Sequence, residues 1–492
     1  MANTAVAYQG KLGKHPFGFR DKFGYMFGDF GNNFTFLLQA GFFMLFYTNV
    51  VGVQASHVGL LLFGARIVDG LTDIVMGIVV DRLPLKEGQY KFKRWIKYIV
   101  IPVAVSSALM YMSFTADFES YAMKVTWMVA TYLLWGSICY TAINIPYGSM
   151  ASVISSDPDD RAALSVYRST GATLGNLVIS SALPLIIYTV NAKGVAILSG
   201  PRMTVVAVVC SALAVACYGA CYVLVDERVP SVVRSKEEGG EGIGKMLATV
   251  FTNKALLGLI VAALILLVTF TFLGGMIGYL FLNYFGNGAL QSPASMAGFI
   301  PSLALIVISP WLAKRFGKAE VGIVAMLTAG LALISAYVLK IENPVVWIVF
   351  YAIGMFAIQV FNYLIWALIT DVIDFQEVRT GVRDDGTVYA VYSSARKLGQ
   401  ALAGGLTGAA LSAIGYDSAV AAAGEAQTEA VNQSIFMLTN VPTGIGALLV
   451  GGALLFLYPL KKKDVEDNVR ILAERRLAAA GIEGKSAMGD LE

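Results

Sequence analysis

The chain alternates between long apolar stretches and short polar breaks. An apolar stretch of about 20 residues lets a helix cross a hydrocarbon core of about 30 Å. Such stretches lie at 23–50, 57–80, 95–114, 121–150, 165–190, 202–225, 255–285, 294–312, 319–339, 344–374, 387–414 and 434–460. The pattern therefore predicts an all-α membrane protein with twelve transmembrane helices.

The longest internal break, 226–253, is rich in glycine and charge and falls near the middle of the chain. It is typical of a linker, here between a six-helix half at 1–225 and a second at 254–460. Two such halves suit a transporter with a binding site near the membrane midplane. A cytoplasmic tail, 461–492, contains apolar residues at near-helical spacing, which predicts an interfacial helix or, alternatively, a partner-binding segment.

Composition favours a bilayer over water as the surroundings of this chain. Hydrophobic residues make up 57% and charged residues 14%, against about 25% charged in soluble domains. So few charges do not suit a soluble enzyme or a disordered chain. A net charge of +3 is too small to indicate a nucleic acid as a partner.

Lysine and arginine indicate the orientation. With the N-terminus inside, cytoplasmic segments hold about 28 of the 36 basic residues and external loops about four. We therefore predict a multi-pass protein of the cytoplasmic (inner) membrane with both termini in the cytoplasm. The four cysteines lie in apolar stretches without metal spacing, and there are only two histidines, so we expect no metal site and no cofactor.

Ionisable residues within the predicted spans are candidates for function, because each is costly at membrane depth. Arg66, Asp69 and Asp73 share one face of the second helix. Two carboxylates one turn apart favour a shared proton or a bound cation. Thr72 and, from the fourth helix, Thr141 are candidates for neutral oxygen ligands. The alternative is structural: Arg66 pairs with Asp69, and Asp73 joins helices.

Polar residues on other helices predict a site for a hydroxyl-rich ligand. Arg168 and Lys397 come from different halves and are placed to flank a central cavity. Amides, carboxylates and aromatic rings at membrane depth are typical of sugar binding. The candidates are Asp29, Asn33, Arg66, Tyr140, Asn144, Asn362 and Tyr392. Helix packing is the alternative for each aromatic residue.

Charges at the cytoplasmic end of the tenth helix predict a gate. Asp371 and Asp374 are followed by Glu377 and Arg383, and Arg161 in the first half is a candidate partner. Ion pairs that form in one access state and break in the other bias a rocking motion. The alternative is a solvated loop whose charges only enforce topology.

The sequence Gly77-x-x-x-Asp81-Arg82 follows the second helix. Together with twelve spans in two halves, it resembles the major facilitator superfamily, where this loop latches the inner side. The continuation Leu83-Pro84-Leu85 departs from the usual pattern. The resemblance implies the major facilitator fold and adds Asp81 and Arg82 to the candidate gate.

Longer motifs give a closer resemblance. They are Gly28-Asp29-Phe30-Gly31-x-Asn33, Ala65-Arg66-x-x-Asp69-x-x-x-Asp73, Asn144-Ile145-Pro146-Tyr147-Gly148-Ser149, Asp160-Arg161-x-x-Leu164-x-x-Tyr167-Arg168 and Asp371-x-x-Asp374-x-x-Glu377. Together they are similar to the glycoside-pentoside-hexuronide:cation symporter family. The match covers the first five helices and the tenth and eleventh.

This resemblance implies roles for individual residues. Asp69, Asp73 and Thr141 would bind the cation beside Arg66, and Asn at position 72 in melibiose-carrying members becomes Thr72 here, which favours H⁺ over Na⁺. The implied sugar positions are Asn33, Asn144, Gly148, Arg168 and Lys397. Melibiose-carrying members have Asp, Asp and Trp at 33, 144 and 148. Another glycoside, such as a β-xyloside, a glucuronide or a plant oligosaccharide, is therefore expected.

The resemblance implies import of a glycoside or oligosaccharide with H⁺ or Na⁺ by alternating access. We expect a carrier that is no enzyme and works as a monomer. The alternative is a major facilitator carrier of lipid-like amphiphiles or of another small polar solute. A membrane enzyme would need a catalytic constellation at depth, and a channel a repeated filter motif; the sequence has neither.

Overall fold

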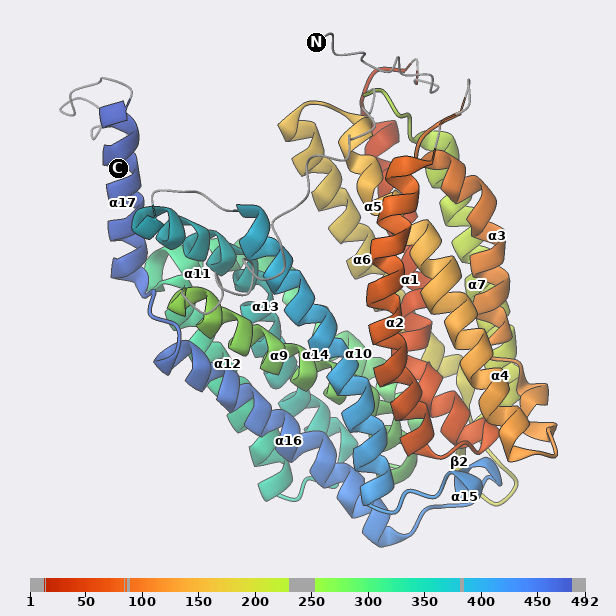
Figure 1. Ribbon diagram of the computed structural model, residues 1–492. Coiled ribbons are helices and arrows are strands. Elements are labelled where there is room, and N and C mark those ends of the chain that lie inside the picture. The colour runs from red at the N-terminus through yellow and green to blue at the C-terminus, as the bar shows by residue number, and fades with distance from the viewer. Residues whose placement is uncertain are drawn as a thin grey trace. The chain divides into compact units, whose positions relative to one another are not determined.

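The computed structural model describes residues 13, 15–83, 85, 89–229, 253–380 and 385–479. These residues are mostly helical (Figure 1). The chain divides into two compact units. Unit 1 comprises Met1–Glu238, Phe272–Met296 and Ala401–Thr439, and unit 2 comprises Gly239–Thr271, Ala297–Gln400 and Asn440–Glu492.

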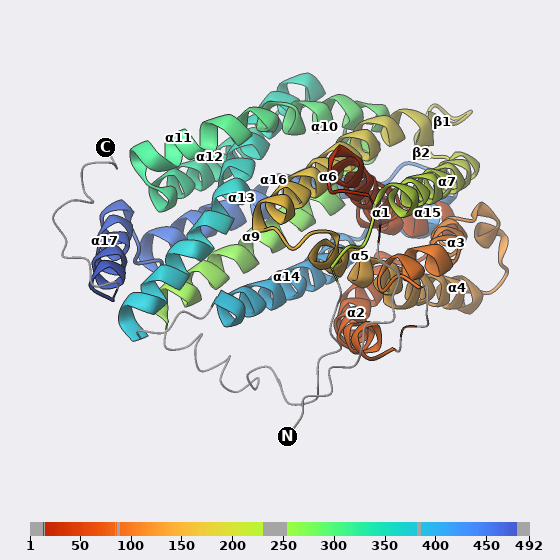
Figure 2. The ribbon, with the colours of Figure 1, turned by 90° about the horizontal axis from the view of Figure 1, so that it is seen from above.

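The first part of the chain forms most of unit 1, and α1 lies at its centre. In chain order its elements are α1 (Phe19–Phe46), η1 (Tyr47–Val51), α2 (Ala55–Arg82), α3 (Lys93–Leu109), η2 (Ser113–Asp117), α4 (Tyr121–Leu133), η3 (Leu134–Tyr140), α5 (Thr141–Ile154), α6 (Pro158–Ile187), β1 (Tyr188–Val190), β2 (Ala196–Leu198) and α7 (Gly200–Leu224). Figure 2 shows α1 between α6 and α7, the two helices it contacts most.

Unit 2 and the remainder of unit 1 are built from the second part of the chain. Its elements are α9 (Lys254–Tyr279), η4 (Leu280–Tyr284), η5 (Gly288–Leu290), α10 (Gln291–Phe299), η6 (Pro301–Ala304), α11 (Leu305–Phe316), α12 (Lys318–Val338), α13 (Pro344–Thr380), α14 (Asp385–Ala413), α15 (Ser418–Ala422), α16 (Glu429–Phe456) and α17 (Lys462–Ala479). In unit 2, α12 packs along α13. The tail helix α17 also contacts α13, and Arg475 donates to the carbonyl oxygens of Glu377 and Val378 near its end.

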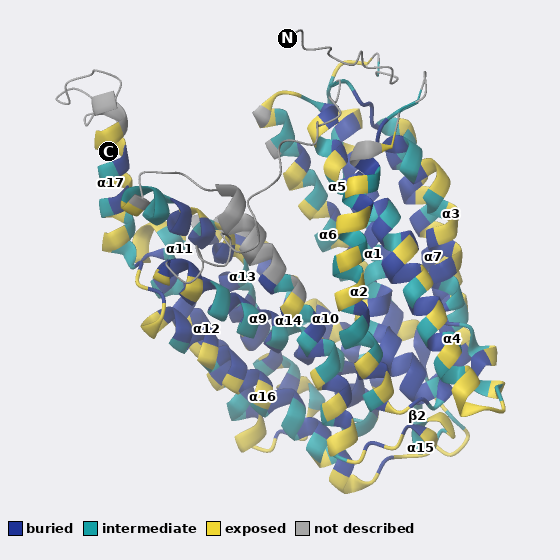
Figure 3. Cartoon of the chain, viewed as in Figure 1, coloured by how far each residue is buried: buried dark blue, intermediate teal, exposed yellow. Residues whose placement is uncertain are grey.

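Within the described ranges, each of the twelve predicted stretches contains helix, although residues 188–190 at the end of the fifth form strand β1. Eight helical segments there are long and apolar enough to cross a membrane by themselves. Two of the remaining four stretches fall short for physical reasons: α3 has only 17 residues, and α2 carries three charged residues on one face. Large apolar side chains along α2, among them Leu60, Leu71 and Ile74, are exposed (Figure 3), as expected of a helix that faces lipid.

Two local features differ from the expectation. A two-stranded hairpin, β1 with β2, follows α6, and its register pairs Tyr188 with Leu198. The predicted linker also begins too early. Asp226 and Glu227 are buried in unit 1, and the Glu227 carboxylate accepts hydrogen bonds from the backbone nitrogens at 91, 92 and 93, where α3 begins. Residues 230–252 lie outside the described ranges.

Candidate functional site

Two carboxylates on α2 face two hydroxyls on the broken fourth helix. Ser137 Oγ donates to Asp69 Oδ1 at 2.6 Å, and Thr141 Oγ1 lies 3.0 Å from Asp73 Oδ1. Each pair is spaced by four residues, so the acidic row and the hydroxyl row run side by side. Ser137 lies in the π-helical segment η3, and π-helical turns inside α-helices occur frequently at functional sites.

Arg66 and Thr72 lie on the same helix as the carboxylates. Arg66 Nη1 is 3.6 Å from Asp69 Oδ2, so the ion pair of the structural alternative is present alongside the two hydroxyl contacts. Thr72 Oγ1 donates to the backbone carbonyl of Asp69 at 3.1 Å. The hydroxyl proton of Thr72 is therefore hydrogen-bonded within α2, so only the oxygen lone pairs remain available to a ligand.

A second polar cluster joins α1 to α6. Arg168 Nε lies 3.0 Å from Asp29 Oδ1, and Asn33 Nδ2 donates to Asp29 Oδ2 at 3.0 Å. The Asp29 side chain is 8% exposed, whereas that of Arg168 is 40% exposed. The guanidinium is thus held by a buried carboxylate and still offers exposed donors. A Cβ at Gly148 would lie 3.7 Å from Arg168 Nη1, so the missing side chain leaves room beside that group.

Asn32, which we did not select as a site residue, is the centre of a third set of contacts. Its Nδ2 donates to Tyr140 Oη at 2.9 Å and lies 3.5 Å from Asn144 Oδ1. Its Oδ1 accepts from Tyr218 Oη at 2.8 Å. Two predicted residues, Tyr140 and Asn144, are therefore brought together by Asn32. Its only sequence signal was the pair of adjacent amides on an apolar helix.

The remaining predicted sugar residues belong to unit 2. Asn362 on α13 donates to Gln359 Oε1 at 3.1 Å. Tyr392 and Lys397 lie on α14, and their side chains are outside the described residues. The grouping of these three residues with the polar clusters of unit 1 stays a prediction.

The predicted gating residues have nearby partners of their own. Asp371 Oδ1 accepts from Lys318 Nζ at 2.5 Å, within unit 2. Arg161 donates to the carbonyls of Ser155 and Ser152 at the end of α5, and its pairing with the tenth helix stays a prediction. Asp374 and Glu377 are partly buried on α13. The side chains of Asp81 and Arg82, and the whole of Arg383, lie outside the described residues.

Buried tyrosines tie η1 and β1 to the second part of the chain, all within unit 1. We call these contacts the tyrosine layer. Tyr279 Oη shares a hydrogen bond with Thr48 Oγ1 at 2.7 Å, Tyr416 Oη donates to Asn49 Oδ1 at 2.8 Å, and Tyr188 Oη donates to Gln291 Oε1 at 2.9 Å. Burial raises the pKa of the Tyr188 and Tyr416 hydroxyls, so both remain protonated donors at physiological pH.

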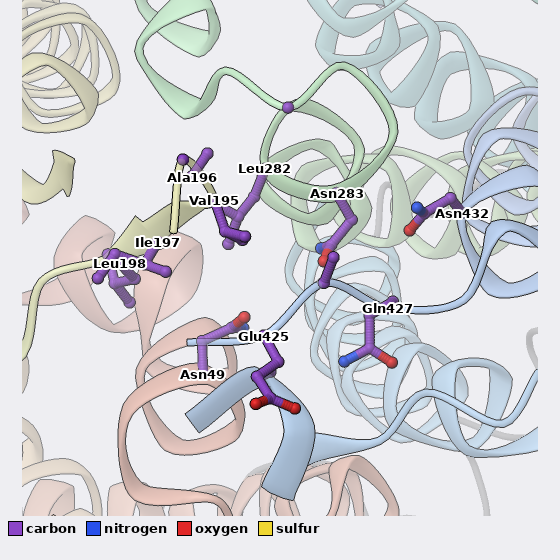
Figure 4. A pocket seen from close by; sticks show the side chains of 14 residues that line it. Asn49, Val195, Ala196, Ile197, Leu198, Leu282, Asn283, Glu425, Gln427 and Asn432 are labelled. Carbon is purple, nitrogen blue, oxygen red and sulfur yellow. The ribbon is translucent and has the colours of Figure 1, made fainter. Parts of the chain in front are cut away.

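A small cavity of about 220 Å³ lies against the tyrosine layer (Figure 4). The amides of Asn49, Asn283, Gln427 and Asn432 line it. Gln427 is already bonded in both directions to the backbone of Asp417. Asn49 likewise donates to the Leu45 carbonyl and accepts from Tyr416. The lining amides thus mostly stabilise the protein itself, and we do not assign a ligand to this cavity.

Comparisons with known proteins agree with this architecture. The family model for MFS/sugar transport proteins matches residues 24–462. The isoprimeverose transporter of Lactiplantibacillus pentosus is 30% identical over 95% of this chain and 96% of its own. A putative sulfoquinovose importer of Escherichia coli K12 is 28% identical, with 95% and 96% covered. A bacterial homologue of the lysosomal transporter Spinster shares the fold, with a TM-score of 0.62, 15% identity, and 92% and 99% covered.

Proposed function

The chain belongs to the family of MFS/sugar transport proteins, and we propose that it is a symporter that imports a glycoside or oligosaccharide together with a cation. It is a multi-pass membrane carrier, and it requires no covalent chemistry. The proposal extends this family membership to a substrate class, to a coupling ion and to particular residues.

The pairing of Asp69 and Asp73 with two hydroxyls is the observation that carries the proposal. Two carboxylates one turn apart in a membrane helix hold a proton or a small cation more readily than they hold two bare charges. Hydroxyl oxygens beside them suit either ion. We expect H⁺ as the coupling ion, with Na⁺ as the alternative, because Thr72 stands where melibiose-carrying members of the similar symporter family have Asn.

Sugar recognition is assigned to the cluster of Asp29, Asn33 and Arg168. A guanidinium held by a buried carboxylate is fixed in position, and its exposed donors match sugar hydroxyls or an acidic sugar substituent. The names of the two relatives, an isoprimeverose transporter and a putative sulfoquinovose importer, support a sugar as the ligand class. Melibiose-carrying members of the similar family have Trp at position 148, whereas this chain has Gly148. The space that the missing indole ring leaves favours a larger substrate.

Coupling follows if the carrier changes access only when both ligands are bound or both are absent. A ligand shifts such an equilibrium only by its differential affinity for the two states. We place the tyrosine layer at the external ends of the helices, since the lysine and arginine distribution puts both termini in the cytoplasm of an inner-membrane protein. The layer would then close the external side, and a monomer would suffice for transport.

The test is transport by the purified protein in liposomes. Internal pH is followed while a panel of glycosides is added, with and without sodium. Glycoside-dependent proton entry without sodium is the expected result, and it identifies the substrate at the same time. Uptake of labelled glycoside only with sodium would correct the coupling ion. No glycoside uptake with either cation, by protein shown to be folded, would overturn the proposal in favour of an amphiphile carrier.

A further inference from the structure

The wall that faces Asp69 contains groups that the symport proposal does not use. Ser137 is 4% exposed and lies opposite the carboxylate. The next residue back, Gly136, has no side chain, and a Cβ there would lie 3.6 Å from Asp69 Oδ1 and 3.4 Å from the ring of Tyr132. The Ser137 hydroxyl and the Gly136 backbone therefore lie beside one oxygen of Asp69, and the Tyr132 ring lies beside Gly136.

Tyr132 adds an independent observation. It is fully buried, and its hydroxyl has no hydrogen-bond partner among the described residues. Its charged neighbours are Arg66 and Asp69. A buried hydroxyl without a partner calls for an explanation, and beside a carboxylate and a guanidinium a bound water or ion is one such explanation. The most direct occupant of this place is a cation, or water bound to one, between Asp69 and the η3 segment.

Ser137 has chemistry that suits such an occupant. A serine hydroxyl is both a donor and an acceptor. Without a cation it donates to Asp69, and with one it rotates and presents a lone pair. Thr141 does the same for Asp73, and the Gly136 carbonyl, which accepts from Thr141 at 3.2 Å, lies within the same π-helical segment. Carboxylates, hydroxyls and carbonyls at irregular helical segments are the oxygen ligands of small cations in transporters.

We propose that Ser137 determines which cation the site accepts: its hydroxyl is the ligand that lets Na⁺ or Li⁺ occupy the place otherwise taken by a proton. The face of α2 carries two carboxylates and one guanidinium, which favours a monovalent ion. This inference rests on the proposed function.

The experiment measures glycoside binding to the purified full-length protein as NaCl or LiCl replaces choline chloride at constant ionic strength. In the unmodified protein, Na⁺ and Li⁺ should tighten binding. Ser137→Ala should raise the half-saturating Na⁺ concentration by about 10- to 100-fold, the usual cost of losing a group that supports a metal site. Ser137→Thr keeps a hydroxyl and should retain the Na⁺ response.

The matched control is Ser211→Ala on α7. Ser211 is also 4% exposed, and the contacts of α7 are with α1, α3 and α6 rather than with α2. Its Na⁺ response should be unchanged. If Ser137→Ala proves too unstable to assay, Tyr132→Phe tests the same wall and should also raise the half-saturating Na⁺ concentration.

Two results would overturn the inference. One is an unmodified protein whose glycoside binding ignores both Na⁺ and Li⁺, and the other is a Ser137→Ala variant with an unchanged Na⁺ response. In either case, glycoside-dependent proton entry would leave the symport proposal standing. Loss of glycoside uptake with every cation, in contrast, would remove the proposed function itself.

Discussion

Unit 1 contains two groups of acidic side chains that differ in the kind of partner they have. At the N-terminal end of α1, the buried Asp21 accepts two hydrogen bonds from Arg228, at 3.0 and 2.9 Å. Glu227 accepts from three backbone nitrogens. We call these residues the base cluster. On α2, Asp69 and Asp73 are bonded to the hydroxyls of Ser137 and Thr141, in addition to the ion pair between Asp69 and Arg66.

The difference lies in what each partner can do when a cation arrives. A guanidinium and a backbone N–H are donors only, so they cannot become ligands of a cation. Their geometry is also fixed, which suits a permanent joint. A hydroxyl rotates between donating to a carboxylate and offering a lone pair. Burial raises the pKa of Glu227 against its three backbone donors, and none of those three donors is able to share a cation. Charge alone therefore does not identify a coupling site.

The largest expected effect is on transport. Asp73→Asn keeps the shape of the side chain but removes the charge that binds the cation, so gradient-driven accumulation should fall to equilibration. Exchange of glycoside across the membrane should continue, because it needs no net cation movement. The measurement is the internal-to-external ratio of labelled glycoside in liposomes. Concentrative uptake at the unmodified level would exclude Asp73 from coupling.

A substitution in the base cluster should have the opposite effect to Asp73→Asn: it should lower stability and leave coupling intact. Arg228→Met leaves the buried Asp21 without its partner and should lower the free energy of unfolding by about 3–5 kcal/mol. The readout is thermal unfolding of the purified protein in detergent. Any variant that survives reconstitution should still accumulate glycoside. A stable Arg228→Met protein that had lost coupling would reverse the distinction between the two groups.

Arg168 tests a third arrangement, an ion pair with an exposed donor. Arg168→Met removes charged hydrogen bonds worth about 1.5–3 kcal/mol each, so the Kd for glycoside should rise by about 10- to 100-fold. Binding to the purified protein gives this value directly. Lys193, whose exposed pair with Glu425 is remote from the cluster, supplies the control in Lys193→Met. Equal affinities in both variants would argue against the assigned sugar site.

The smallest effect concerns the tyrosine layer. Tyr416→Phe removes one buried hydrogen bond, worth about 1 kcal/mol, and should shift the access equilibrium about fivefold toward the externally open state. A cysteine at Leu282, a buried position lining the cavity, should then react faster with an external thiol reagent.

Tyr111→Phe is the matched control, since the buried Tyr111 hydroxyl has no partner among the described residues. It should leave the labelling rate unchanged. Because Tyr416 stays protonated, the difference between the two variants should be the same at pH 6 and pH 8. Slower labelling in Tyr416→Phe would show that the layer does not hold the external side closed.

The sequence by itself determined the helices and the placement of charge along them. In lipid every backbone group must be bonded within its own segment, so the long apolar stretches could be interpreted as helices from the sequence, and eight helical segments among the described residues are long and apolar enough to cross a membrane. The spacing of Asp69 and Asp73 likewise follows from the helical period. The hairpin after α6 was missed, because three-residue strands carry too little pattern.

Only the tertiary structure decided the partners. Three sets of contacts depend on which faces of distant helices pack together. They are the hydrogen bond of Ser137 to Asp69, the ion pair of Arg168 with Asp29, and the contacts of Asn32 with three side chains. The same packing moved Asp226 and Glu227 from a predicted linker into the body of unit 1. Helical periodicity places residues on a face of one helix, whereas the neighbour of that face is selected by packing over the whole chain, and that packing leaves no local pattern.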